Sequence, residues 1–460
     1  MRLPTDTDHA VRIDQPSMRA ILAFAAALLA FGCSSDRIDG SPSTGGAASV
    51  SGGTATTSGG TNPSGGTSAS GGAAGSTNTS AVTWSEHIAP LVYRECIGCH
   101  RGGGIAPFSM TDYAETRPLA AALVSVTANR EMPPMPVNGS GSCNTYSNAR
   151  WLTDAEIALF DAWAAQGAPE GDPKLAPKLP PAPIGLNVVS ATLDPGAEYS
   201  PDASLSDDYR CFIVDSGLTS DAYLVGYEVV PGDARVVHHA IVYSPQTDAD
   251  ATAAEGLDRA QAGLGYTCFG GAGVDAEPRV LWAPGVGVTK LPNNTGLPLV
   301  GGRKLILQVH YNLTPGSFPD RTLVRLQTVP SVARPAAYLA VADTRMSVAP
   351  GQELGTTTRT GAGVTSPIRV YGVLPHMHTL GRTLRVNATA AGNTTCLVDV
   401  DRWDFHWQNA WWYETPLDFE SIAAVNITCG YDTRTRTTPV TWGEGTSDEM
   451  CLNYLYVTAR

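Results

Sequence analysis

Six side chains in the second half of this 460-residue chain could bind metal ions. They are five imidazoles and one thioether in two groups of three: His238, His239 and His310, then His376, His378 and Met450. Among first-row metals, nitrogen and soft sulfur ligands together favour copper. We therefore predict two separate copper sites. Zinc is the weaker alternative, because a thioether is a poor zinc ligand.

A haem attachment motif lies earlier in the chain. Cys96-Ile97-Gly98-Cys99-His100 has the C-x-x-C-H pattern, in which two cysteines form thioether links and the histidine becomes the proximal iron ligand. We therefore predict that Cys96, Cys99 and His100 bind one covalent c-type haem.

The sixth iron ligand is sought in a Met-Pro-Pro-Met-Pro stretch, which resembles the distal loop of bacterial class I cytochrome c modules. A thioether stabilises reduced iron and raises its potential. Met132 is the first choice and Met135 the alternative. The alternative is that these methionines bind no iron and only pack against Trp151 or Trp163.

Strand geometry decides how the histidines can meet. Residues at i and i+2 of a strand project from one face, so His376 and His378 can bind one ion directly. Adjacent residues such as His238 and His239 point to opposite faces of a regular strand. Joint ligation by this pair therefore requires a β-bulge, a feature common beside active sites.

His310 lies in the apolar run 305–312, where strand alternation places it on one face with Gln308 and Asn312. A lone histidine in a strand is more often a structural residue. The histidine pair upstream favours ligation here.

The predicted secondary structure of the folded part changes once, from helices to strands. Residues 84–94, 117–130 and the run opened by the capping box at Thr153 and Glu156 predict helices, and the Pro-rich segment 174–183 predicts an extended spacer. Beyond it, short runs rich in Val, Ile, Thr and Tyr between turn residues predict antiparallel sandwiches. These runs are 223–230, 236–243, 305–312 and 368–373.

The N-terminal part predicts export. An apolar run at 20–31 has the length of a signal peptide core, with Met18 as the expected true start, and Ala30-Phe31-Gly32-Cys33 resembles a bacterial lipobox. An ordinary signal peptide is the alternative. Residues 34–80 are almost wholly Gly, Ser, Thr and Ala, which predicts a flexible tether. The net charge of -13 argues against nucleic acid, so we expect membrane contact only through a lipid anchor.

From about residue 184 to 460 the chain resembles the copper type II, ascorbate-dependent monooxygenases, the family of the peptidylglycine α-hydroxylating and dopamine β-monooxygenases. The motifs that carry the resemblance are Val237-His238-His239-Ala240, Gln308-Val309-His310-Tyr311-Asn312, Pro375-His376-Met377-His378 and Ser447-Asp448-Glu449-Met450-Cys451.

The resemblance implies a mainly β fold of two tandem eight-stranded antiparallel jelly-roll sandwiches, here preceded by a small all-α cytochrome c-like domain. It assigns an electron-transferring copper to the first histidine group. The oxygen-activating copper and the substrate would lie at the second group, across a solvent-filled cleft. The predicted boundaries are 1–33 signal or lipoprotein peptide, 34–80 tether, 81–173 haem domain, 174–183 linker, 184–335 first sandwich and 336–460 second sandwich.

The chain departs from the peptide-amidating branch of the family beside the second site. That branch has Arg and Asn at the positions of Leu374 and Leu452, whereas Tyr454 keeps the family's tyrosine. Without these polar groups, the clamp for a peptide carboxylate is missing. The departures argue against peptide amidation and leave Tyr454 as a candidate catalytic residue.

Six cysteines remain after Cys33, Cys96 and Cys99 are assigned, and an exported chain predicts disulfides among them. The resemblance implies the pairs Cys429–Cys451 and Cys211–Cys268. Cys143 and Cys396 stay unassigned.

The resulting hypothesis is an exported copper monooxygenase that uses O2 to hydroxylate a C–H bond of a small organic substrate. Its own haem would deliver electrons to the first copper, supplementing or replacing ascorbate, with an external donor reducing the haem. The alternative is a non-catalytic electron-transfer or copper-handling protein.

Overall fold

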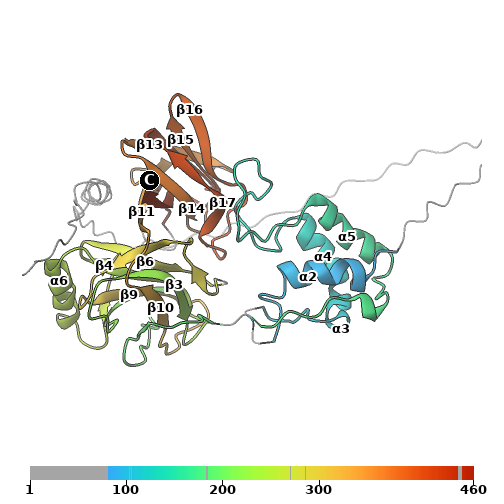
Figure 1. Ribbon diagram of the computed structural model, residues 1–460, viewed down its shortest axis with the longest axis horizontal. Coiled ribbons are helices and arrows are strands. Elements are labelled where there is room, and N and C mark those ends of the chain that lie inside the picture. The colour runs from blue at the N-terminus through green and yellow to red at the C-terminus, as the bar shows by residue number, and fades with distance from the viewer. Residues whose placement is uncertain are drawn as a thin grey trace, which may run out of the picture.

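The computed structural model describes residues 81–102, 104, 106–182, 185–269, 271–284, 286–443 and 448–460. The predicted signal peptide, Cys33 and the tether lie outside these residues. Figure 1 shows a helical part at one end and two β-rich parts, coloured green to yellow and orange to red. The predicted mainly β fold is confirmed.

Short helices make up the N-terminal part. They are η1 (Trp84–Ile88), α2 (Ala89–Glu95), α3 (Tyr113–Thr116), η2 (Arg117–Leu119), α4 (Ala120–Ala128), α5 (Asp154–Ala165) and η3 (Pro173–Leu175). The predicted capping box at the start of α5 is present, because the backbone N–H of Glu156 donates to Thr153 and that of Thr153 donates to the Glu156 carboxylate. Phe160 and Trp163 of α5 pack with Ile88 in a small apolar core.

One long sheet runs through both β-rich parts. Its order is β1 (Ala191–Leu193), β10 (Leu323–Val329), β3 (Ala222–Val230), β8 (Thr295–Leu299), β11 (Arg334–Ala342), β20 (Leu452–Ala459), β14 (Ile368–His376) and β17 (Trp411–Phe419), with β7 (Thr289–Lys290) beside β3. β8 and β11 join its halves through a short parallel pairing of Thr295 with Arg334.

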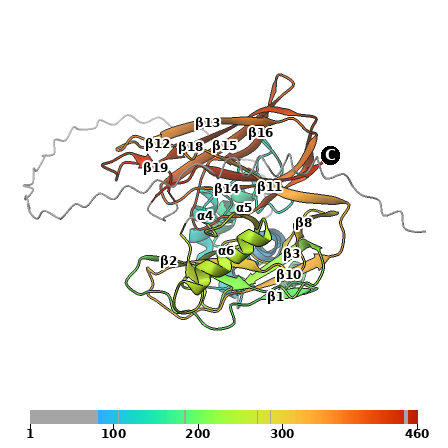
Figure 2. The same ribbon diagram turned by 90° about the vertical axis from the view of Figure 1, so that its left-hand side faces the viewer.

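Each half of the long sheet is covered by a second sheet. The first cover is β5 (Tyr266–Thr267), β2 (Asp207–Val214), β9 (Leu305–Asn312), β4 (Val237–Pro245) and β6 (Ala276–Trp282). The second is β13 (Gly355–Val364), β18 (Ile422–Tyr431), β15 (Gly381–Ala390) and β16 (Asn393–Val400). β12 (Ser347–Val348) pairs with β19 (Val440–Thr441), and α6 (Asp248–Arg259) crosses the first part in Figure 2.

Alternating apolar residues close each pair of sheets into a sandwich. Leu224, Leu307 and Val309 are buried in the first core, and Val386 and Ile427 are buried in the second. Each such side chain contributes about 1.5–3 kcal/mol when fully buried. The cores therefore fix the strands that carry the predicted metal ligands.

The two sandwiches also pack against each other. Tyr338, Leu374 and Tyr456 project from the second half of the long sheet into the core of the first sandwich. The hydroxyls of Tyr456 and Thr295 lie 2.8 Å apart across this contact. The two sandwiches therefore share buried apolar surface as well as a sheet.

Three disulfides are present, which is consistent with export. Cys211–Cys268 and Cys429–Cys451 confirm the pairs that the resemblance implied. Cys143–Cys396 ties the segment between α4 and α5 to β16. Within the part of the chain that the structure describes, no helix is long and apolar enough to cross a membrane.

Hydrogen bonds reinforce the link between the helical part and the second sandwich. The side-chain amide of Asn144 donates to the carbonyl oxygens of Cys396 and Leu397. That of Asn148 donates to the carbonyl oxygen of Ala410. The helical part is therefore attached to the second sandwich at several points.

Candidate functional site

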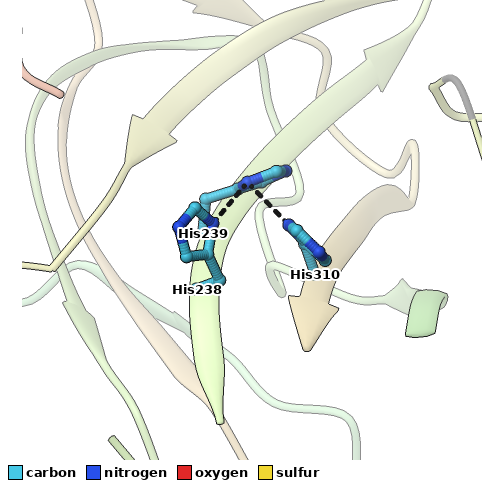
Figure 3. A group of neighbouring side chains, drawn as sticks. All are labelled: His238, His239 and His310. Atoms are coloured by element: carbon cyan, nitrogen blue, oxygen red, sulfur yellow. Dashed lines mark hydrogen bonds between the residues drawn. The ribbon is translucent and has the colours of Figure 1, made fainter. Parts of the chain in front are cut away.

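The first histidine group is assembled by β4 and β9. Val237 pairs with Tyr311 and His239 pairs with His310, so His238 is an extra residue between the two pairs. This register shift is the β-bulge that joint ligation by adjacent histidines requires, and its prediction is confirmed. Figure 3 shows the three side chains turned toward one another.

The three rings converge through their Nδ1 atoms. Nδ1 of His239 lies 3.4 Å from Nδ1 of His238 and 3.2 Å from Nδ1 of His310 (Figure 3). One ligand atom from each ring lies within 4.8 Å of the others. Burial lowers the pKa of all three, that of His238 to about 3. The rings are therefore neutral at physiological pH, which is the form that binds metal ions.

Two residues of β2 orient His310. Its Nε2–H donates to Oδ1 of Asp207 at 2.8 Å, which fixes the tautomer and leaves Nδ1 unprotonated on the side of the other histidines. Such carboxylate partners typically support metal-binding histidines. The ring of Tyr209 stacks on His310 with centroids 4.1 Å apart. Sequence reasoning missed both residues, because their only signal is the pairing of β2 with β9.

The second histidine group lies where β14 meets the start of β20. His376, the last residue of β14, pairs with Leu452, the first residue of β20, so His378 and Met450 lie just outside these strands. The backbone N–H of His378 donates to the Glu449 carboxylate, and its ring bonds to the carbonyl oxygen of Asp448. The two imidazole centroids are 5.1 Å apart. The structure thus brings the two imidazoles together, and Met450 directly follows the two residues that hydrogen-bond to His378.

Hydrogen bonds fix the tautomers of both rings in this group. Nδ1–H of His376 donates to Oε1 of Gln408 at 2.5 Å, and Nδ1–H of His378 donates to the carbonyl oxygen of Asp448 at 3.1 Å. Metal contacts of these two rings would therefore use Nε2. Burial lowers the pKa of His376 to about 3.

A buried carboxyl group joins the segment before β20, which contains Met450, to residues 376–380, which are called the histidine turn below. Glu449, which is fully buried, accepts hydrogen bonds from the backbone N–H groups of His378 at 2.9 Å and Leu380 at 2.6 Å. Burial raises its pKa to about 7. The hydroxyl of Tyr431 donates to the carbonyl oxygen of Met450 at 2.8 Å. Glu449 therefore positions Met450, a role the sequence did not reveal.

One aromatic ring lies between the two histidine groups. Phe405 stacks on His238 with centroids 4.5 Å apart and meets His378 edge to face at 5.9 Å. The resemblance implied that a solvent-filled cleft separates the two sites. Between His238 and His378 the structure instead places this buried phenyl group.

The residues that depart from the peptide-amidating branch surround the second site. Leu374 pairs with Tyr454, as His376 pairs with Leu452, so the four share one face of β14 and β20. Leu374 and Leu452 are buried. Tyr454 lies 6.0 Å from Tyr338, centroid to centroid. This face is lined by apolar and phenolic groups where the amidating branch has polar ones.

The C-x-x-C-H residues lie together after α2. Cys96 and Cys99 are free thiols, whereas six other cysteines form disulfides. Burial raises the pKa of Cys96 to about 12. The ring of His100 packs on Phe108, with centroids 4.5 Å apart. Nη1 of Arg150 lies 3.4 Å from Sγ of Cys99.

The two candidate distal methionines differ in burial but line the same cavity. Met135 is 4% exposed and packs in the core of the second sandwich. Met132 is half-buried, and both side chains line a cavity with Arg150 and Trp151. Met132 and Met135 therefore both remain candidates for the distal ligand.

Comparison with known proteins agrees with this geometry. Residues 342–458 match the C-terminal domain of the copper type II ascorbate-dependent monooxygenases. The chain is 23% identical over 252 residues to tyramine beta-hydroxylase of Caenorhabditis briggsae and 24% identical over 285 residues to MOXD1 homolog 1 of Drosophila melanogaster. These matches cover 50% and 55% of this chain, and 40% of each relative.

The similarity to a solved viral structure is too weak to support a family for this chain. The VP2 subviral particle of infectious bursal disease virus matches 61% of this chain and 75% of its own at 12% identity, with a TM-score of only 0.19. The family match and the two relatives support the copper type II, ascorbate-dependent monooxygenase family.

Proposed function

We propose that this chain is an exported copper monooxygenase that hydroxylates a C–H bond of a small organic substrate with O2. The observation that carries the proposal is the convergence of three neutral imidazoles on one point, with Asp207 behind His310. Bound copper supplies one-electron redox chemistry and oxygen activation. His238, His239 and His310 would hold one ion, and His376, His378 and Met450 the other.

The chain's own residues prepare both sites. Asp207 and Gln408 keep one proton on the outer nitrogen of His310 and His376, so the inner nitrogen can act as a ligand. Glu449 fixes the backbone on either side of the second site. The buried Leu374 and Leu452 exclude water near that site and favour an apolar portion of the substrate. We propose that substrate binds on this face beside Tyr454.

We further propose that Cys96, Cys99 and His100 hold a covalent c-type haem with Met132, or alternatively Met135, as the distal ligand. Two observations support it. The two thiols are free in a chain whose other described cysteines are paired. Burial also lowers the pKa of His100, so its ring is in the neutral form that iron binds.

The helical part shares a cavity with both sandwiches. Arg150, whose Nη1 lies 3.4 Å from Sγ of Cys99, lines this cavity together with Gln408, whose amide oxygen accepts from His376, and with Pro284 and Val286 of the first sandwich. We propose that the haem delivers its electrons to the first copper. We propose that the haem, ascorbate or both supply the electrons, with an external donor reducing the haem.

We also propose a lipid anchor at Cys33. The lipobox-like sequence supports it, and the disulfides are consistent with export. Labelling the expressed chain with a radioactive fatty acid tests this, because Cys33→Ser should abolish the label and leave Cys96 and Cys99 untouched.

Two matched methionine variants test the catalytic proposal. Met450→Leu removes the proposed ligand, whereas Met377→Leu removes a thioether that is fully buried in the core of the second sandwich. We expect Met450→Leu to lose copper at one site and to stop O2-dependent reoxidation of the reduced protein. Met377→Leu should keep both.

The outcome also decides between catalysis and a non-catalytic relay. Copper stoichiometry by mass spectrometry, the Cu(II) electron paramagnetic resonance (EPR) spectrum and O2 uptake with ascorbate would be measured on the same samples. If Met450→Leu binds both coppers and reoxidises as wild type does, the assignment of Met450 is wrong. If wild type binds both coppers but never consumes O2 with any substrate of a broad panel, the relay function replaces the proposed one.

A further inference from the structure

Phe405 belongs to the segment 403–410, which connects β16 to β17 and is called the bridge segment below. Phe405 is 8% exposed, and its ring is nearly parallel to that of His238, with an interplanar angle of 22°. The edge contact with His378 has an interplanar angle of 76°. One side chain of the second sandwich therefore touches a proposed ligand of each metal site.

The bridge segment is attached to the second site by two hydrogen bonds and is braced by a third within the segment. Nε1 of Trp403 donates to the carbonyl oxygen of His378 at 3.0 Å. Gln408 accepts from His376 and, through Nε2, donates to the carbonyl oxygen of Phe405 at 2.9 Å. Phe405 is thus held from both ends of the segment, and its ring points at the first site.

Gly381 shows how closely the segment is packed. A Cβ atom at this position would lie 2.7 Å from Cδ1 of Trp403 and 2.9 Å from Cβ of Met377. Neither atom is the far end of a flexible side chain. The bridge segment therefore has little room to shift relative to the histidine turn.

We infer that Phe405 is a positioning residue that holds the two metal sites against one aromatic ring and so sets their separation. The inference rests on the proposed function, because it takes both histidine groups as metal sites. With the ring in place, water is excluded between His238 and His378. Aromatic pairs prefer stacked or edge-to-face geometry, and both geometries are present here.

The distance between two bound Cu(II) ions tests this inference. Pulsed EPR of the fully loaded, oxidised protein should give one short, narrow distance distribution. Phe405→Ala should lose that short distance and give a longer, broader distribution. Phe405→Leu keeps apolar bulk without the ring and should shift partly, whereas Phe405→Trp keeps an aromatic bridge and should retain the short distance.

Phe269 provides the matched control. It packs on Tyr209 beside the first site, with centroids 5.3 Å apart, but is 56% exposed. Phe269→Leu should leave the distance distribution unchanged. An unchanged distribution in Phe405→Ala with both ions bound would overturn the inference.

Hydrogen exchange of the metal-free protein separates failure of the inference from failure of the proposed function. If wild type binds no copper, the proposed function fails, and exchange still reports on the bridge. Phe405→Ala should then speed exchange in β4 and in residues 376–380 together. Faster exchange in the second sandwich alone would show that Phe405 serves only its own sandwich, and would overturn the inference.

Discussion

Asp207 offers a quantitative test of the first site. The His310 ring that it supports is 1% exposed and donates its Nε2–H to the Asp207 carboxylate, whose side chain is 22% exposed. Loss of an outer partner of a metal-binding histidine typically weakens metal affinity about 10–100-fold. A tenfold change corresponds to about 1.4 kcal/mol, so we expect Asp207→Ala to cost about 1.4–2.7 kcal/mol of copper binding at this site.

The assay is a competition titration against a copper chelator, with EPR distinguishing the two sites. Asp207→Ala should lower affinity at the first site and leave the second unchanged. Asp207→Asn should have a smaller effect, since an amide oxygen can still accept the proton of Nε2 but without charge.

Asp208 is the matched control on the same strand. Its carboxylate accepts from the hydroxyl of Tyr199 at 2.7 Å and from the backbone N–H of Asp202 at 3.1 Å, and not from a histidine. Asp208→Asn should therefore leave copper affinity unchanged. Equal affinity in Asp207→Ala and wild type would refute the reasoning, because it would mean that His310 needs no oriented tautomer or does not bind the ion.

Three further predictions concern stability. Replacing both Cys143 and Cys396 by Ser should destabilise the protein by about 2–4 kcal/mol in denaturant unfolding; an unchanged midpoint would show that non-covalent contacts alone hold the helical part. Thr153→Ala should cost about 1 kcal/mol by loss of the cap of α5, seen as a lower melting temperature, and Thr153→Ser should restore it. Gly381→Ala should cost about 1–3 kcal/mol through overpacking against Trp403 and weaken copper uptake at the second site only; loss at the first site alone would contradict this.

Local patterns in the sequence placed His238, His239 and His310 on their strands, whereas His378 and Met450 lie just outside β14 and β20. The alternation of apolar residues predicted the strand that carries His310. The adjacency of His238 and His239 required a bulge, because a flat strand separates neighbouring side chains, and the register of β4 on β9 contains it. The capping box at Thr153 likewise marked the start of α5.

The residues that orient the ligands could not be predicted in the same way. Asp207 is 103 positions from His310, and Gln408 is 32 positions from His376. Nothing in their immediate sequence distinguishes them from surface polar residues. Only strand pairing and the path of the bridge segment bring them to the rings.

The pairing of Cys143 with Cys396 was open for a related reason. The two residues are 253 positions apart, and one of them lies in a segment without repetitive structure. Their contact depends on how the helical part docks. Docking is decided by side-chain packing such as that of Met135 in the second core, and no hydrophobic period in the sequence records it.

The bridge segment explains why these long-range contacts belong together. Gln408 and Trp407 line a cavity together with Arg150 of the helical part, and Phe405 contacts His238 of the first sandwich. A displacement of this segment would therefore disturb the second site, its contact with the first, and the cavity beside the haem motif at once. If the proposed haem and the two proposed copper sites exchange electrons, the distances between them depend on the bridge segment more than on the strands that carry the ligands.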